Sequence, residues 1–185
     1  PAIGGVGLIQ DLSNTMTISL KKEGSYICVI GNSNNHLGNS QYLSIIKNKE
    51  IGSTPSIDLE EELKNGKFIL NFIEQNKFEA VHDIGDGGLL VALAEMSIYG
   101  GKGVNLDINK SSLIEYLFGE DQSRYLVEIS KDNFEEFMRK AEKNNVSVEK
   151  IGITQADQFE IKNIGKIKVD DLIQAYESWF KKFTN

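Results

Sequence analysis

Apolar and polar residues alternate with two different periods along this chain, which predicts a mixture of strands and helices. The expected strands are short apolar runs at 6–9, 26–30, 80–82, 104–108, 125–129, 146–154, 158–161 and 166–169. The expected helices carry apolar residues at helical spacing and cover about 39–49, 58–73, 89–97, 113–118, 134–143 and 170–182. Strands and helices do not alternate strictly, so the pattern favours an α+β sandwich whose helices cover a largely antiparallel or mixed sheet.

Polar residues at the predicted helix ends refine two of these elements. Asn39 is expected to cap the first helix through its side-chain oxygen. Asp58 precedes three glutamates that suit the positive end of a helix dipole. Gly66 is expected to weaken or break that second helix, because glycine is a poor helix former.

Composition limits the class of protein. The 185 residues, 40% apolar and 25% charged, fit one soluble globular domain spanning 1–185. The net charge of −7 argues against a nucleic-acid partner. No run approaches the roughly 18 apolar residues of a spanning helix, so no membrane association is expected. Because the chain starts with Pro1 and not with methionine, we expect it to be a fragment of a longer protein.

The lone cysteine, Cys28, lies in an apolar strand-like run and cannot form an internal disulfide, which favours the reducing cytoplasm. We interpret it as a core residue. No serine lies in a nucleophile-elbow pattern, and His36 and His82 lack zinc-ligand spacing. Glutamine hydrolysis by this chain is therefore not expected.

The segment from His82 to Leu89 is the sharpest local feature, since a strand turns through three glycines into a helix. Backbone amides at Gly87 and Gly88 could hold an anion, and Asp83 could hold a Mg²⁺ ion that neutralises phosphates. The alternative is a plain tight turn in which Asp86 caps the helix. The glycine spacing matches neither the phosphate-loop nor the dinucleotide fingerprint.

A second feature is the polar loop before the strand at 125–129. Glu120 and Gln122 could bind ribose hydroxyls or metal, and Arg124 could meet phosphate through paired donors. The alternative is a solvated turn in which Glu120 or Asp121 merely pairs with Arg124.

These two segments resemble a known family. His82 to Met96, reading HDIGDGGLLVALAEM, and Leu117 to Arg124, reading LFGEDQSR, look like matching motifs in the synthetase subunit of phosphoribosylformylglycinamidine synthases. The opening segment, Pro1 to Asp11, resembles the start of that subunit's last domain. The glycine turn alone is similar to a wider superfamily that includes aminoimidazole ribonucleotide synthetase, selenophosphate synthetase and thiamine monophosphate kinase.

The resemblance implies a three-layer α/β/α domain, the last of four in a subunit that converts formylglycinamide ribonucleotide, ATP and glutamine-derived ammonia to formylglycinamidine ribonucleotide. It implies ATP and Mg²⁺ as cofactors. The implied partners are the remaining domains, a glutaminase subunit and a small accessory subunit. The reacting pocket is expected elsewhere in the subunit, so this fragment alone is expected to be inactive and to lack catalytic residues.

The matching positions for an auxiliary nucleotide site are Asp83 for metal, with Gly87, Gly88, Glu120, Gln122 and Arg124 for nucleotide. Two departures weaken that expectation. A glycine-glycine-serine-glutamate run of the family reads Gly38 to Gln41 here, with one glycine and the carboxylate replaced, and Gly85 stands where some relatives carry serine. A scaffolding domain, or another ATP-using enzyme of the superfamily, are the alternatives.

Overall fold

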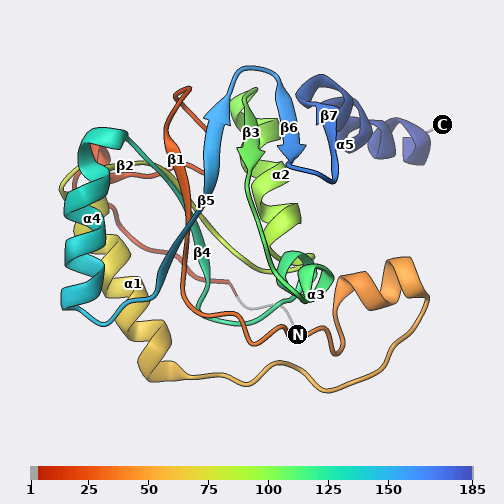
Figure 1. Cartoon of the computed structure of the whole chain (residues 1–185), viewed down its shortest axis with the longest axis horizontal. Coiled ribbons are helices and arrows are strands. Elements are labelled where there is room, and N and C mark those ends of the chain that lie inside the picture. Colours follow the sequence, from red (N-terminus) through yellow and green to blue (C-terminus); the bar gives the residue numbers. More distant parts are fainter. Residues whose placement is uncertain (1–3, 185) are drawn as a thin grey trace.

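The computed structural model describes residues 4–184, apart from the side chains of residues 181 and 182. One mixed sheet lies between two layers of helices (Figure 1). Its strands are β1 (Tyr26–Ile30), β2 (Phe78–Asp83), β3 (Gly103–Leu106), β4 (Tyr125–Ile129), β5 (Val148–Gln155), β6 (Gln158–Ile161) and β7 (Gly165–Lys168). The helices are α1 (Leu59–Glu74), α2 (Gly88–Gly100), α3 (Leu113–Phe118), α4 (Lys131–Lys143) and α5 (Val169–Thr184), with a 3₁₀ turn at Leu12–Asn14 and a π-helical turn at Tyr42–Ile46.

The sheet has the strand order β2-β4-β1-β5-β3-β6-β7. Every neighbouring pair is antiparallel except β3 and β6, which run parallel. The prediction of a mixed, largely antiparallel sheet is therefore confirmed.

Successive residues of the central strands point to opposite faces and build two cores. In β1, Cys28 and Ile30 face the layer of α1 and α4, whereas Ile27 and Val29 face the layer that contains α2. Both faces of the strand are buried, which explains why its sequence is continuously apolar. The three-layer α/β/α arrangement is confirmed.

Aromatic rings fill the core under α1 and α4. Phe72 has no exposed surface, and its ring centroid lies 5.1 Å from that of Phe78 and 5.3 Å from that of Phe137. Cys28 is fully buried beside this cluster, and burial raises the pKa of its thiol to about 12. Its interpretation as a core residue and not a nucleophile agrees with this environment.

Two local predictions were wrong, and a third was wrong in part. Residues 6–9 form no strand, and Val6 and Leu8 are fully exposed, because no strand edge among the described residues lies beside them. Asn39 does not cap a helix, since its φ of 55° is left-handed, and the Ser40 hydroxyl instead accepts from the Leu43 amide. Gly66 was expected to weaken or break α1; the helix continues through it to Glu74, so Gly66 does not break it, and the weakening stays a prediction.

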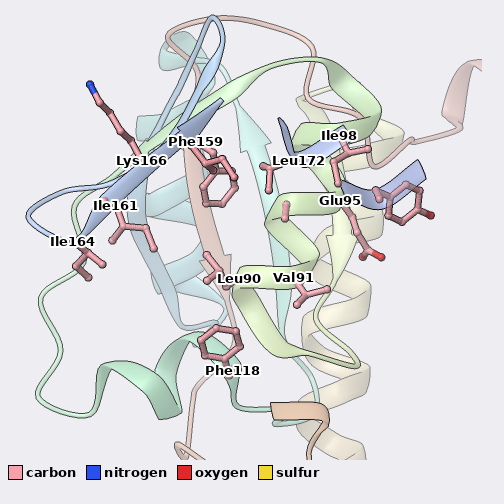
Figure 2. Close-up of a pocket in the computed structure, with 14 residues that line it drawn as sticks. Leu90, Val91, Glu95, Ile98, Phe118, Phe159, Ile161, Ile164, Lys166 and Leu172 are labelled. Carbon is pink, nitrogen blue, oxygen red and sulfur yellow. The ribbon is translucent and has the colours of Figure 1, made fainter. Parts of the chain in front are cut away.

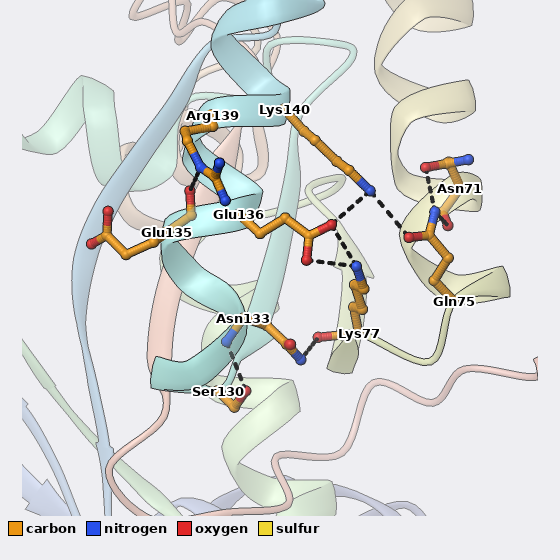
Figure 3. A network of polar contacts seen from close by, with 9 residues as sticks. All are labelled: Asn71, Gln75, Lys77, Ser130, Asn133, Glu135, Glu136, Arg139 and Lys140. Atoms are coloured by element: carbon orange, nitrogen blue, oxygen red, sulfur yellow. Dashed lines mark hydrogen bonds and ion pairs between the residues drawn. The ribbon is translucent and has the colours of Figure 1, made fainter.

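A charged network ties α4 to the chain just before β2 (Figure 3). The Lys77 ammonium donates to both carboxylate oxygens of Glu136 at 2.6 Å, and Lys140 lies 2.9 Å from one of them. Hydrogen bonds from Lys77 and then Lys140 lower the pKa of Glu136 to about 2.

Replacing Glu136 with glutamine is expected to lower the urea midpoint of unfolding at pH 7. A carboxylate whose pKa falls on folding adds stability above its usual pKa of 4.5, and that stability is lost as the pH drops toward about 2. The difference between Glu136→Gln and the unmodified protein should therefore shrink across that interval. Glu135→Gln, on the neighbouring position of α4, is the control and should change little; a pH-independent difference would contradict the prediction.

None of the helices in residues 4–184 combines the length and apolar character that crossing a membrane requires.

Candidate functional site at the glycine turn

Strand β2 ends at Asp83, and the chain then turns through two left-handed glycines into α2. Gly87 has a φ of 83° and Gly88 a φ of 73°, values that favour glycine. A Cβ atom on Gly88 would lie 2.6 Å from the carbonyl carbon of Phe118 and 2.8 Å from the oxygen of Gly119. The start of α2 therefore packs backbone against backbone on the loop that follows α3.

The amides of this turn already have partners inside the domain. The Gly87 amide donates to Oε1 of Glu120 at 2.8 Å, and the Gly88 amide donates to the Gly85 carbonyl at 3.0 Å. The same Glu120 oxygen accepts from the Gln41 amide at 2.8 Å. Asp86 makes no capping hydrogen bond, because Gly87 holds the cap position. A carboxylate of the protein thus occupies the place where an outside anion would meet the Gly87 amide.

Asp121 fastens the same loop to the segment after β1. It is 2% exposed and accepts from the Ser33 hydroxyl at 3.0 Å and the Asn34 amide at 3.1 Å. Glu120 adds a backbone bond, from its amide to the His36 carbonyl at 3.3 Å. The two acidic residues together hold the 33–41 loop against the glycine turn.

Arg124 lies inside the protein and not in a solvated turn. It is 1% exposed, and among residues 4–184 only Nη1 has a hydrogen-bond acceptor, the Gly119 carbonyl at 3.3 Å. Within the described part of the chain it forms no ion pair with Glu120 or Asp121, and its Nε and Nη2 atoms have no partner. Burial lowers the pKa of its guanidinium, opposed by the nearby Tyr116, Asp121 and Glu149. The alternative of a solvated turn with paired charges is therefore wrong.

Asp83 is the candidate magnesium ligand. Its side chain is 77% exposed, and Nδ1 of His82 lies 3.1 Å from its Oδ1 atom. No group of three or more His, Cys, Asp and Glu side chains suited to a metal occurs in residues 4–184. Magnesium is often held by one or two carboxylates together with phosphates and water, so an exposed Asp83 at the strand end fits that mode.

The structure separates the six predicted site residues into three places. Gly87, Gly88 and Glu120 lie together at the glycine turn, and Asp83 ends the strand that leads into it. Gln122 lines a separate polar pocket of about 260 Å³, and Arg124 lines another cavity.

Sequence reasoning missed the contact between His82 and Glu95. Nε2 of His82 lies 3.0 Å from Oε2 of Glu95, on α2. The available signal was that Glu95 is the one charged residue in the otherwise apolar segment 88–100.

A large apolar groove beside α2 was also missed (Figure 2). It has a volume of about 550 Å³ and is flanked by Leu90 and Val91 of α2, Phe118 at one end, and Ile161 and Ile164 on the β6–β7 side. The sequence feature that could have predicted this groove is that α2 is apolar on all sides, whereas a helix with one face in solvent is polar on that face.

One departure from the family pattern is accommodated by local geometry. Asn39, in place of a glycine, adopts a φ of 55°, and asparagine is among the residues that best tolerate a left-handed conformation. The left-handed conformation at this position therefore does not require a second glycine.

Residues 22–162 match the family described as AIR synthase related protein, C-terminal domain. The chain belongs to that family.

Within it, the chain is similar to curated proteins called phosphoribosylformylglycinamidine synthase subunit PurL. It is 41% identical over 184 residues to the one from Bartonella tribocorum, covering 99% of this chain and 25% of that protein. It is 39% identical over 187 residues to the one from Pelagibacter ubique, again covering 99% and 25%. The chain thus spans about a quarter of the length of these relatives, and the predicted resemblance is confirmed.

Solved structures share the fold. PurL of Thermotoga maritima complexed with FGAR superposes with a TM-score of 0.71 at 18% identity, covering 88% of this chain and 30% of that one. Thiamine-monophosphate kinase from Stenotrophomonas maltophilia gives a TM-score of 0.58 at 16% identity, covering 80% and 52%. At these identities the likeness concerns the fold alone.

Proposed function

We propose that this chain is the C-terminal synthetase-type domain, residues 1–185, of the synthetase subunit of a phosphoribosylformylglycinamidine synthase. The observation that carries the proposal is the 41% identity to a PurL subunit over nearly the whole chain. The complete subunit then converts formylglycinamide ribonucleotide, ATP and glutamine-derived ammonia to formylglycinamidine ribonucleotide, as a ligase of purine biosynthesis.

The proposal includes ATP and Mg²⁺, the cytoplasm, and three kinds of partner. Solved relatives include T. maritima PurL complexed with ATP and the PurLQS of the same organism, which supports a nucleotide and an assembly of subunits. The partners proposed for this chain are the remaining domains of its own subunit, a glutaminase subunit and a small accessory subunit.

Within the subunit, we assign this domain a supporting role and not the reaction itself. The Gly87 and Gly88 amides have internal partners, and Arg124 is buried. Asp83 is the exposed group that would hold a Mg²⁺ ion, which would neutralise the phosphates of an auxiliary nucleotide. The nucleotide contacts of Gly87, Gly88, Glu120, Gln122 and Arg124 stay predictions. A nucleotide phosphate at Gly87 must first displace the Glu120 carboxylate.

The test compares the full-length subunit with isolated residues 1–185 for ATP-dependent amidine formation from formylglycinamide ribonucleotide and ammonia. The full-length protein is expected to be active, and the isolated chain, with its fold verified by circular dichroism, is expected to show no turnover. Activity of the isolated chain would contradict the supporting role. A full-length protein that is inactive here but phosphorylates thiamine monophosphate would point to the other branch of the superfamily.

A further inference from the structure

We propose that the cavity beside Arg124 is a binding site for the phosphate group of a small molecule. The cavity has a volume of about 300 Å³ and lies between the loop after β1, the helix α3 and the start of β5. Its lining includes Asn32, Ser33, Lys110, Tyr116, Arg124 and Glu149. The resemblance named Arg124 as a contact of an auxiliary nucleotide site, but its guanidinium lines this separate cavity, so the present proposal holds whether or not the function proposed above is correct.

The Arg124 guanidinium is buried, and two of its nitrogen atoms lack an acceptor among the described residues. A buried guanidinium normally has acceptors for its donors, because unpaired buried donors destabilise the folded state. Here Nε and Nη2 are buried without a partner among residues 4–184, and the Nη1 bond to Gly119 is long at 3.3 Å. The protein itself therefore leaves one edge of a planar donor group unsatisfied.

The carboxylates near Arg124 are bonded to other groups. Glu149, the carboxylate in the cavity lining, lies 2.8 Å from the Lys110 ammonium and accepts from the Tyr116 hydroxyl at 2.9 Å. Asp121 is engaged by the loop after β1. Each nearby carboxylate thus has partners of its own, and the charge of Arg124 has no directly bonded anion within the described part of the chain.

The Arg124 guanidinium packs against an aromatic ring that helps to hold it in place. Its carbon lies 5.7 Å from the ring centroid of Tyr116, whose hydroxyl is in turn fixed by Glu149. A pre-positioned arginine presents parallel N–H groups that match two oxygens of a phosphate, which a lysine cannot reproduce. Asn32, exposed at the same cavity, can supply an amide donor.

This cavity is distinct from the glycine turn. None of residues 83–88 lines it, and the backbone at Gly119 lies between the two places, since Gly88 packs against that residue and Arg124 donates to its carbonyl. The phosphate could be the free ion or the ester of a sugar, and both present the same oxygens.

The test titrates the full-length protein with inorganic phosphate by calorimetry, without other substrates and at constant ionic strength. Arg124→Lys keeps the positive charge but loses the paired donors, and it is expected to weaken phosphate binding about tenfold. Asn32→Leu, at the exposed rim of the cavity, is also expected to weaken phosphate binding. It provides the test if Arg124→Lys does not fold. Lys143→Met removes an exposed positive charge at the end of α4 and should change nothing.

A parallel titration with ribose 5-phosphate separates the two sources. Tighter binding than phosphate, lost in Arg124→Lys, identifies an ester; equal affinities identify the free ion. Phosphate binding that is absent, or unchanged by both Arg124→Lys and Asn32→Leu, overturns the proposal, because any ion bound then lies elsewhere in the subunit.

Discussion

Replacing Gly88 with alanine is expected to destabilise the protein by about 3 to 5 kcal/mol, the combined scale of a strained left-handed residue and an overpacked core. The added Cβ atom would lie 2.6 Å from the Phe118 carbonyl carbon. The backbone φ of 73° at this position also disfavours alanine. The clashing atoms belong to backbone and not to a flexible side chain, so relief requires moving the loop at 117–124 away from α2.

Chemical denaturation of the full-length protein measures this effect as the difference in the free energy of unfolding between Gly88→Ala and the unmodified protein. Gly66→Ala is the matched control, because it introduces the same methyl group at a helical position of α1. Apart from the chain neighbours and the backbone of α1 itself, no atom of the described residues would lie within 4 Å of that methyl group. That control should be stabilised by up to about 1 kcal/mol. Equal responses of the two variants would show that the contact of Gly88 with the loop is not tight.

Replacing Glu120 with alanine is expected to destabilise the protein by about 2 to 3 kcal/mol, because two backbone amides lose a charged acceptor. The affected donors are the amides of Gly87 and Gln41, each 2.8 Å from Oε1 of Glu120. Glu142→Ala, at an exposed position of α4 without a side-chain contact of this kind, should have little effect.

Calorimetry with Mg-ADP on the full-length protein shows what Glu120 does at the glycine turn. If its carboxylate fills the anion position, Glu120→Ala should bind the nucleotide at least as tightly as the unmodified protein, whereas Asp83→Asn should weaken an auxiliary site. Weaker nucleotide binding in Glu120→Ala at unchanged stability would instead make Glu120 a ligand contact. Binding that neither substitution alters would favour a purely scaffolding domain.

Most of the fold could be predicted from periodicity, because the central strands and long helices bury regular apolar faces. The strand at Tyr26–Ile30 was predicted at its observed bounds, and Asp58 does cap α1, accepting from the Glu60 and Glu61 amides at 3.0 Å. Residues 6–9 have the same apolar character, but apolar character does not provide a pairing partner. Strand formation there depends on an edge that local sequence does not specify.

The candidate site was harder to predict because its decisive contacts join distant segments. The glycine turn and the acidic loop were both recognised, but nothing in either segment shows that Glu120 meets the Gly87 amide or that Arg124 is 1% exposed. A run of charged residues usually indicates solvent exposure, and here two of its members, Asp121 and Arg124, are buried. Whether the loop at 117–124 is a buried connection or a surface turn is decided by the packing of α2 against it, which the local sequence does not show.

The hydrogen bonds that Glu120 and Asp121 accept from the 33–41 loop also affect how the chain folds. The contacts join residues 79 positions apart, Glu120 with Gln41, and 88 positions apart, Asp121 with Ser33. Closing such long loops costs entropy before the contacts repay it, so they form slowly compared with local helices. The 33–41 loop is therefore expected to reach its native path only when these distant segments meet, together with the equally long-range pairing of β1 and β4.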